Sequence, residues 1–304
     1  MSGPVTEGEP AGGARKRPLV TFWRVVAVLA LGLAAYALFF ARDTGPKGPH
    51  IAVHEIFGVI FVDDARNAVL REIADDPEAA ALILRIDSPG GTTTGAEALF
   101  EAIRAVAGEK PVVAVMGEVA ASGGYIAAVA ADHVLAYGNT LTGSIGVVTQ
   151  QPDLSGLLAS LGIEMRENRS DVFKAAPSPF GPVPPEVAAW EDELIADAYS
   201  WFRGLVADRR GLSGAALDRV ADGRVFTGRQ ALDVGLIDGL GGLDAARDWL
   251  DGQGVDADLP LRLREVPKER PNLLLDLLTS RLGIDADALR LRQGIGVRLY
   301  SILR

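Results

Sequence analysis

Residues 111–131 read PVVAVMGEVAASGGYIAAVAA, and this stretch decides the fold class. The apolar run from Pro111 to Met116 predicts a strand that is buried on both faces of a sheet. The turn Ser122-Gly123-Gly124 follows, and it opens an apolar helix predicted over Tyr125 to Ala131. A buried strand, a glycine turn and a helix in this order are typical of a parallel sheet flanked by helices.

The same alternation continues on both sides of this stretch. Ala80 to Ile86 predicts a second buried strand, which ends at the turn Ser88-Pro89-Gly90-Gly91 and precedes a helix predicted over Gly95 to Val106. Further strands are expected within residues 50–62, 134–137 and 144–149, and further helices within 65–74, 186–210 and 211–248. The sequence therefore predicts an α/β fold with a mostly parallel sheet.

A long apolar segment precedes this domain. Leu19 to Ala41 holds 23 residues with one charge, Arg24, and as a helix it would span roughly 34 Å, enough for a bilayer core. Basic residues 15–17 directly precede it, so the positive-inside rule places the N-terminus in the cytoplasm. A cleaved secretory signal is the alternative, but the uncharged stretch from Val25 is long for one and no A-x-A site follows. We expect a retained anchor.

This anchor sets the domain organisation. We expect a disordered cytoplasmic tail over residues 1–18, a transmembrane anchor over 19–41, a linker over 42–49, one folded domain over 50–268 and an amphipathic C-terminal tail over 269–304. The tail alternates Leu and Ile with Arg and Asp, a pattern suited to docking on a neighbouring molecule.

Composition excludes several classes of function. The formal net charge of −10 argues against a broad basic face for nucleic acid. Cysteine is absent, which rules out a thiol nucleophile, a disulfide framework and a Cys-ligated metal. Only three histidines occur, His50, His54 and His133, which argues against a His-rich metal site. We therefore expect no metal, no cofactor and no nucleic-acid partner.

Three glycine-bearing turns follow buried strands, at residues 88–91, 121–124 and 142–146. Unpaired N–H groups at such turns bind phosphate or stabilise an oxyanion. None has the spacing of a P-loop or a dinucleotide fingerprint, so the phosphate alternative lacks support. Ser122 begins a helix with the Gly123 N–H just beyond it, which fits a nucleophile beside an oxyanion hole. A serine before Gly-Gly is also a common helix N-cap, so this signal alone is weak.

A nucleophilic serine needs a base. His54 lies in a predicted strand and His133 between a helix and a strand, and no carboxylate pattern points to a triad, so both are interpreted as structural. Only five lysines occur, and Lys174 alone is flanked by apolar residues, in VFKAAP. Arg replaces lysine almost everywhere else, yet only lysine can lose its proton near neutrality, once desolvation lowers an amine pKa from about 10.4 to about 7–8. Lys174 is therefore a candidate general base.

These motifs together resemble the bacterial signal peptide peptidase A family of Ser/Lys membrane proteases, in its short single-unit form. The matching segments run in order across residues 50–248: IAVHEIFGVI (51–60), LRIDSPGG (84–91), AASGGYI (120–126), LTGSIGVV (141–148), FKAAPSPF (173–180) and GRVFTGRQALDVGLIDGLGGLDA (223–245). One departure stands three residues before the lysine, where many members have glycine and this chain has Asp171. A carboxylate facing inward there would keep the amine protonated.

The resemblance implies a role for each matching residue. Ser122 would be the nucleophile, Lys174 the general base and Ser144 the residue that orients the amine. The oxyanion hole would combine the Gly123 N–H with that of Gly90 or Gly91. The implied fold is a Clp protease/crotonase-like core of repeated β-β-α units, preceded by one N-terminal transmembrane helix, so that residues 50–268 form the protease domain.

The resemblance also implies partners and a location. The substrates would be remnant signal peptides and other apolar exported or membrane segments. The chain would form a homo-oligomer, a tetramer or octamer, with active sites near subunit interfaces and with its dyad on one chain or shared between two. It would cross the bacterial inner membrane once, through residues 19–41, with the catalytic domain on the periplasmic side. No cofactor is implied.

Two other functions remain open. A crotonase-type acyl-CoA enzyme also uses two backbone N–H donors, but it needs cytosolic CoA, and the predicted anchor places this domain on the other side. A non-catalytic membrane scaffold on the same fold would have no use for both Ser122 and Lys174. Cleavage of apolar peptides by the wild type, lost on substitution of either residue, separates these possibilities.

Overall fold

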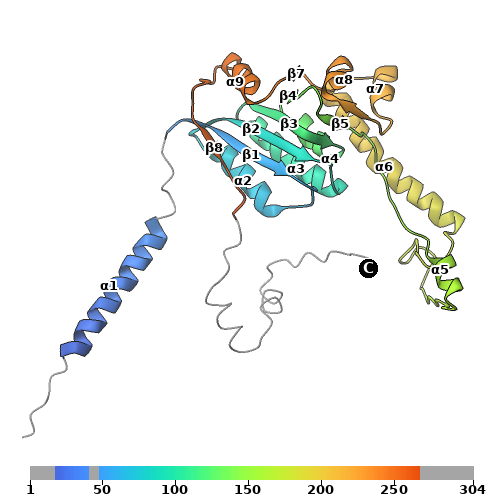
Figure 1. Ribbon diagram of the computed structural model, residues 1–304, viewed down its shortest axis with the longest axis horizontal. Coiled ribbons are helices and arrows are strands. Elements are labelled where there is room, and N and C mark those ends of the chain that lie inside the picture. Colours follow the sequence, from blue (N-terminus) through green and yellow to red (C-terminus); the bar gives the residue numbers. More distant parts are fainter. Residues whose placement is uncertain (1–17, 41–47, 268–304) are drawn as a thin grey trace, which may run out of the picture. The chain divides into compact units, whose positions relative to one another are not determined.

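Eight strands form one sheet in this computed structural model, which describes residues 18–40 and 48–267. The hydrogen-bonded order is β6-β5-β3-β2-β1-β8, with β4 paired to β3 and β7 to β4 (Figure 1). All pairings are parallel except the antiparallel pair β5–β6, which confirms the prediction of a mostly parallel sheet. The strands are β1 (His50–Phe57), β2 (Ala79–Ser88), β3 (Val112–Ala121), β4 (His133–Ala136), β5 (Leu141–Gly143), β6 (Val225–Thr227), β7 (Gly239–Leu240) and β8 (Leu261–Leu263).

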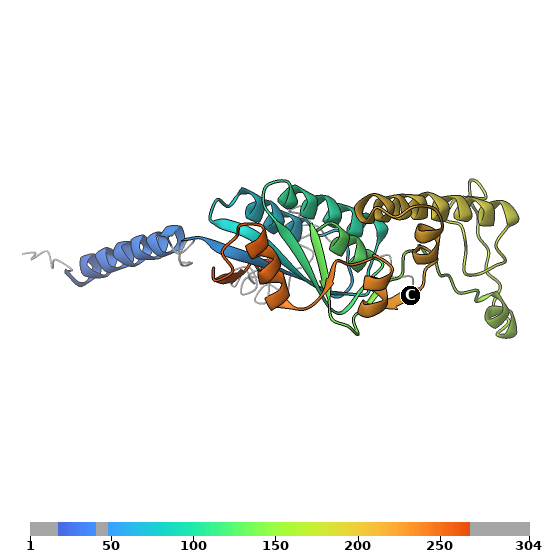
Figure 2. The same ribbon diagram turned by 90° about the horizontal axis from the view of Figure 1, so that it is seen from above.

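Helices cover both faces of this sheet. They are α2 (Asp64–Asp75), α3 (Thr93–Ala107), α4 (Gly123–Val129), α5 (Ser155–Ser160), α6 (Pro185–Arg210), α7 (Gly214–Val220), α8 (Gly228–Asp233) and α9 (Leu243–Gly252). Side chains alternate along the strands, so Leu84 and Met116 pack with α2, α3 and α4, whereas Ile83 and Val115 pack with α9. Figure 2 shows α3 and α6 on one side of the sheet and α9 on the other. The result is a mixed α/β fold of three layers.

On the edge opposite β2, strand β3 pairs with two different strands in turn. Its first half, Val113–Met116, pairs with β4, and its second half, Val119–Ala121, pairs with β5. The Asp87 carboxylate accepts the Val119 N–H at 3.2 Å, which holds the irregular step between the two halves. Ser122 follows directly, so the sheet itself determines where this serine lies.

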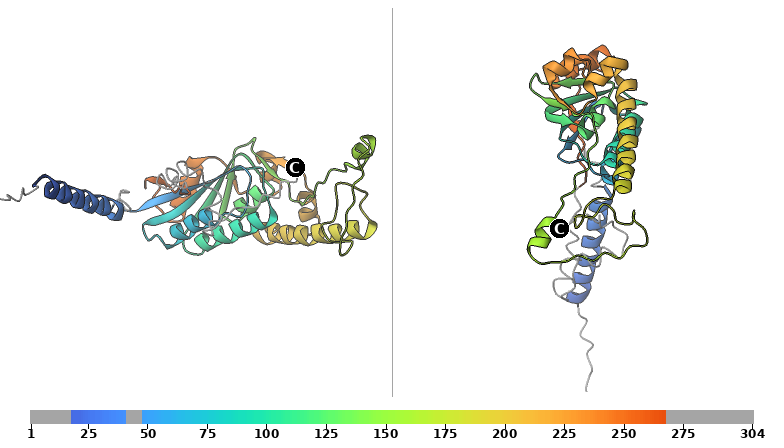
Figure 3. Two further views of the ribbon diagram at one scale, coloured as in Figure 1. Left: turned by 90° about the horizontal axis from the view of Figure 1, so that it is seen from below. Right: turned by 90° about the vertical axis from the view of Figure 1, so that its right-hand side faces the viewer.

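After β5 the chain makes a long excursion before it returns to the sheet at β6. It contains α5, which has no buried residue, and leads into α6, a helix of 26 residues of which only Val187, Phe202 and Val206 are buried. Figure 3 shows this excursion reaching beyond the sheet alongside α6. We call residues 150–184 the arm.

Two sequence predictions differ from the structure. The strand expected over residues 144–149 is wrong, because the strand is Leu141–Gly143, and Gly143 (φ 81°) and Ser144 (φ 51°) then turn the chain away from the sheet. The repeated β-β-α units are present only in part, since single strands and helices alternate from β1 to α4. The second strand of the first unit is reduced to an isolated bridge between Ile60 and Gly91, because Gly58 (φ 74°) turns the chain out of β1.

The chain divides into two compact units, residues 1–48 and 49–304. In the first, α1 (Pro18–Phe40) is a helix of 23 residues, and its large apolar side chains described by the structure are exposed. Across residues 18–40 and 48–267, no helix combines the length and the hydropathy needed to cross a membrane. The predicted cytoplasmic tail, linker and C-terminal tail lie almost entirely outside the described residues.

Candidate active site

Ser122 occupies a strained turn between β3 and α4. Its backbone has φ 53° and ψ −118°, a conformation that non-glycine residues rarely adopt and that occurs mostly at functional sites. The Ser122 N–H donates to the Gly143 carbonyl at 2.9 Å. The side chain is half-buried and makes no capping hydrogen bond to α4, although Ser122 is the N-cap residue. Helix capping therefore does not explain this serine, and its hydroxyl is left for another purpose.

The glycine turn after β2 packs directly against Ser122. A Cβ added to Gly90 would lie 2.9 Å from both the Ser122 Cβ and the Gly123 nitrogen, and one added to Gly123 would lie 3.2 Å from the Gly91 nitrogen. Only glycines allow the two turns to approach this closely. Gly90 also needs its positive φ of 107°. The predicted glycines and the predicted nucleophile are thus neighbours.

Hydrogen bonding distinguishes Gly90 from Gly91. The Gly90 N–H donates to Ser88 Oγ at 3.1 Å, so it is already used within the turn. In the bridge to Ile60, the Ile60 N–H donates to the Gly90 carbonyl at 2.8 Å and the Thr92 N–H to the Ile60 carbonyl at 2.9 Å. This parallel pattern turns the Gly91 N–H away from Ile60. Among the hydrogen bonds of the described residues, neither the Gly91 nor the Gly123 N–H has an acceptor.

Ser144 directly follows β5, the strand that pairs with the end of β3 before Ser122. Ala121 pairs with Gly143 in the β3–β5 register, and each serine is the first residue after the end of its strand. Ser144 is half-buried, has φ 51°, and donates its N–H to the Arg224 carbonyl at 2.8 Å. The structure therefore brings Ser122, Ser144 and the three predicted glycines to one end of the sheet.

Lys174 is not part of this cluster in the single chain. It lies on the arm in a tight turn, where its N–H donates to the Asp171 carbonyl at 3.1 Å and the next residue, Ala175, has φ 55°. Its side chain is exposed, and its amine forms no hydrogen bond or ion pair with any residue in the described ranges. The ring of Phe173 packs edge-on against Trp190 of α6, with centroids 5.9 Å apart.

Asp171 helps to shape this turn and does not pair with the amine. Its Oδ1 accepts the Phe173 N–H at 3.4 Å, and no ion pair joins it to Lys174 in the described part of the chain. The departure from the glycine common at this position therefore leaves the lysine amine unpaired in the single chain.

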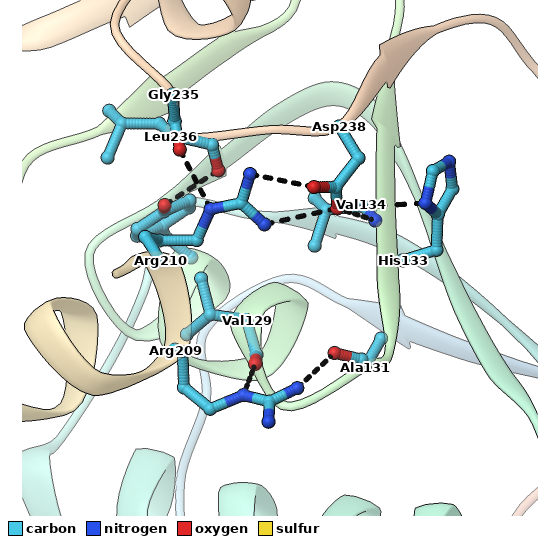
Figure 4. A network of polar contacts seen from close by, with 10 residues as sticks. Val129, Ala131, His133, Val134, Arg209, Arg210, Gly235, Leu236 and Asp238 are labelled. Carbon is cyan, nitrogen blue, oxygen red and sulfur yellow. Dashed lines mark hydrogen bonds and ion pairs between the residues drawn. The ribbon is translucent and has the colours of Figure 1, made fainter. Parts of the chain in front are cut away.

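The histidines make structural contacts elsewhere. His54 is buried in β1, where its Nδ1–H donates to the Arg264 carbonyl at 2.7 Å, and burial lowers its pKa. His133 stacks on Trp249 at 5.0 Å, and its Nδ1 lies 3.8 Å from Asp238 Oδ2 (Figure 4). Burial lowers the pKa of His133 as well. None of these contacts of His54 and His133 involves Ser122.

Two supporting features were not found from the sequence. Ser88 is fully buried and fixes the Gly90 turn through its hydroxyl, and only its place before Pro-Gly-Gly hinted at a role. The Arg224 carbonyl holds Ser144, but it belongs to a segment far along the chain, and no sequence signal connects the two. In the described residues no group of three or more His, Asp or Glu side chains is arranged to hold a metal ion.

Comparison with known proteins identifies the family. The model of peptidase family S49 matches residues 104–256. A putative protease of Synechocystis sp., slr0021, is 35% identical over 251 residues, which cover 81% of this chain and 89% of that protein. The chloroplastic serine protease SPPA of Arabidopsis thaliana is 34% identical over 246 residues, covering 77% of this chain but only 36% of the longer relative.

Clp protease is among the structural neighbours. A ClpP1 mutant from Listeria monocytogenes matches 62% of this chain and 91% of its own, with a TM-score of 0.42 and 17% sequence identity. A match this distant supports no statement about activity or assembly. The family model and the sequence relatives show the family instead: this chain belongs to peptidase family S49, as a serine protease of the signal peptide peptidase A type.

Proposed function

We propose that the chain is a membrane-anchored serine endopeptidase that works through a Ser122–Lys174 dyad. The observation that carries this proposal is the Ser122 turn. The Ser122 backbone there is strained, and its hydroxyl makes no capping hydrogen bond to α4. The N–H groups of Gly91 and Gly123 lie beside it, and neither has an acceptor among the described hydrogen bonds. That arrangement suits a nucleophile with an oxyanion hole.

The reaction would proceed through an acyl-enzyme. The neutral Lys174 amine takes the hydroxyl proton as Ser122 Oγ bonds to the peptide carbonyl carbon, and the resulting oxyanion receives the Gly91 and Gly123 N–H groups. The C–N bond then breaks, and the ammonium returns the proton to the departing amine. Water, deprotonated by the same lysine, releases the acyl group and restores Ser122. Ser144, next to Ser122 in the sheet register, would orient the amine by a hydrogen bond.

The position of Lys174 supports an assembly in which the dyad is completed between subunits. In the single chain the lysine is exposed and lies on the arm, apart from the Ser122 cluster. The arm also exposes large apolar side chains that a neighbouring copy would cover: Leu154, Leu157, Leu161, Ile163 and Met165. We therefore infer a homo-oligomer, a tetramer or octamer, whose active sites lie near subunit interfaces.

Substrate and location follow from the sequence and the family. Residues 19–41 are apolar and follow a basic cluster, which supports a bilayer anchor with a cytoplasmic N-terminus and an extracytoplasmic catalytic domain on the bacterial inner membrane. A relative from Enterococcus faecium is named a putative signal peptide peptidase SppA. We propose remnant signal peptides and other apolar exported or membrane segments as substrates.

Cleavage of apolar fluorogenic peptides by the full chain in detergent or nanodiscs tests the dyad. Ser122→Ala and Lys174→Ala should each lose activity by on the order of 10⁴-fold. Lys174→Arg should be equally inactive, because a guanidinium keeps its charge but does not lose its proton. Ser160→Ala, an exposed serine of α5, is the matched control and should retain activity. A wild type inert across a peptide panel would leave the scaffold alternative in place, and an active Lys174→Ala would remove the lysine from the mechanism.

Mixing two inactive variants tests the shared dyad. If the base comes from a neighbouring subunit, mixed oligomers of Ser122→Ala and Lys174→Ala contain some sites with both groups intact, and activity should return. If both groups belong to one chain, no mixed oligomer has a complete site, and the mixture should stay inactive. Crosslinking of the full chain in a lipid bilayer gives the subunit number.

A further inference from the structure

The N-terminal end of helix α6 contacts the tight turn that holds Lys174 (residues 171–175), which we call the lysine turn. Trp190 lies in the second turn of α6, and its ring packs edge-on against Phe173, the residue directly before Lys174, with centroids 5.9 Å apart and ring planes at 65°. One turn earlier, Val187 is fully buried. The start of α6 is therefore the surface against which the lysine turn packs.

At its C-terminal end, the same helix contacts the helix that follows Ser122. Arg209 donates from Nε to the Val129 carbonyl at 2.8 Å and from Nη2 to the Ala131 carbonyl at 2.7 Å (Figure 4). These carbonyls lie at the end of α4, which begins at Gly123 directly after the nucleophile. A planar guanidinium that binds two carbonyls fixes both distance and orientation, which a lysine amine does not.

The neighbouring arginine fixes the same end of α6 to the sheet. Arg210 donates to both carboxylate oxygens of Asp238, at 2.9 and 3.0 Å, and from Nε to the Gly235 carbonyl at 2.8 Å. Asp238 in turn accepts the Val134 N–H of β4 at 2.8 Å. Although burial raises the pKa of this carboxyl, the Arg210 contacts and the Val134 N–H hold it below its ordinary value, so the pair stays ionised.

The length of α6 makes its orientation matter. Trp190 and Arg209 are separated by 19 residues of continuous helix, about 28 Å at 1.5 Å per residue. A tilt of about 5° at the arginine end would move the tryptophan end by roughly 2.5 Å over that length. A displacement of about 1 Å in a catalytic group can cost about 100-fold in rate.

We propose that α6 sets the position of Lys174 relative to α4, the helix that follows Ser122, with Trp190 and Arg209 as the positioning residues at the two ends of α6. The inference rests on the dyad proposed above. The inference holds whether Lys174 acts on Ser122 of its own chain or of a neighbouring copy. In either case α6 connects the lysine to α4, the helix that follows Ser122 in the same chain. Neither residue touches substrate; each acts through a catalytic group.

The full-length protein tests this with two substitutions, one at each end. Arg209→Gln removes the two-carbonyl contact, and Trp190→Leu removes the ring packed on Phe173. Arg203→Gln is the matched control, because Arg203 lies on the same helix and its ion pair with Asp218 is exposed. We expect kcat to fall tenfold to 100-fold in both test variants with KM little changed, and Arg203→Gln to match the wild type.

Two further readouts separate positioning from simple loss of structure. Trp190→Phe keeps an aromatic ring and should restore most of the rate. Melting temperatures and the rate of fluorophosphonate labelling of Ser122 should be recorded for every variant.

The outcomes distinguish this inference from the function on which it rests. If the wild type cleaves and both dyad variants are inactive, but Trp190→Leu and Arg209→Gln behave as Arg203→Gln does, only the positioning role fails. The positioning role also fails if the activity lost in Trp190→Leu and Arg209→Gln is fully accounted for by their lower melting temperatures. If the wild type is inert, the dyad fails and the inference fails with it.

Discussion

Substituting Gly91 by alanine tests the proposed oxyanion hole at its most constrained position. A Cβ added there would lie 1.8 Å from the Ile60 carbonyl oxygen and 2.5 Å from the Ile60 carbonyl carbon. The obstacle is backbone, so no side chain can rotate away. An ordinary carbon–oxygen contact is about 3.3 Å or more, so the Gly91 and Ile60 backbones must separate by roughly 1.5 Å.

Such a movement has two measurable consequences. It breaks the hydrogen bonds on either side of the Ile60 bridge, of 2.8 and 2.9 Å, at about 1 kcal/mol each. For a domain of this size, about 2 kcal/mol corresponds to a fall in Tm of about 4–8 °C. It also displaces the Gly91 N–H from the oxyanion position, and loss of one such donor typically lowers kcat by about 10²- to 10³-fold.

The assay compares Gly91→Ala with Gly108→Ala in the full chain. Gly108 ends α3 with helical φ and ψ, and a Cβ there would meet nothing nearer than 3.5 Å, so its variant should match the wild type in rate and in Tm. Peptide cleavage gives kcat, and a fluorophosphonate gives the acylation rate of Ser122. Full activity in Gly91→Ala, or an equal loss in Gly108→Ala, would refute the assignment of the Gly91 N–H.

Two further predictions concern buried groups outside the active site. Tyr125→Phe removes a buried hydroxyl that donates to the Leu236 carbonyl at 2.7 Å, so the free energy of unfolding should fall by about 1–2 kcal/mol in urea titrations while kcat stays unchanged. Acid should destabilise the domain from about pH 6.5 downward, because the unfolded chain then binds protons at His54 and His133, whose folded pKa values are lowered by burial. The unfolding free energy should fall by up to about 1.4 kcal/mol per pH unit for each histidine, and His54→Asn should flatten the slope; an unchanged slope in that variant would contradict the assignment.

The sequence predicted the sheet well where strands are buried on both faces. The continuous apolar runs before Ser88 and before Gly117 are typical of strands that are buried on both faces of a parallel sheet, and both are central strands. The run from Ile145 to Val148 looked similar but is not a strand. Gly143 and Ser144 take left-handed angles just before it, and the Arg224 carbonyl that fixes Ser144 comes from a distant segment. Local sequence does not contain that contact.

The candidate site was predictable only on the nucleophile side. Ser122 and its glycines belong to turns adjacent in the sheet, so strand order alone brings them together. Lys174 was expected in an apolar environment because of its neighbours in the sequence, yet it is exposed in the single chain. If the environment of the amine comes from another copy, as we propose, the sequence of one chain can indicate the residue type needed but not its surroundings.

The positive φ angles at Ser122, Ser144 and Ala175 have a consequence for engineering. They are the only non-glycine residues with such angles in the described part of the chain, and each costs the fold about 1 kcal/mol or more. Glycine adopts these angles freely. At Ser122 the change that relaxes the backbone also removes the hydroxyl of the proposed nucleophile, so we expect Ser122→Gly to be inactive and yet more firmly folded. Such a variant would suit the capture of uncleaved peptides, since the neighbouring turns stay in place while turnover is absent.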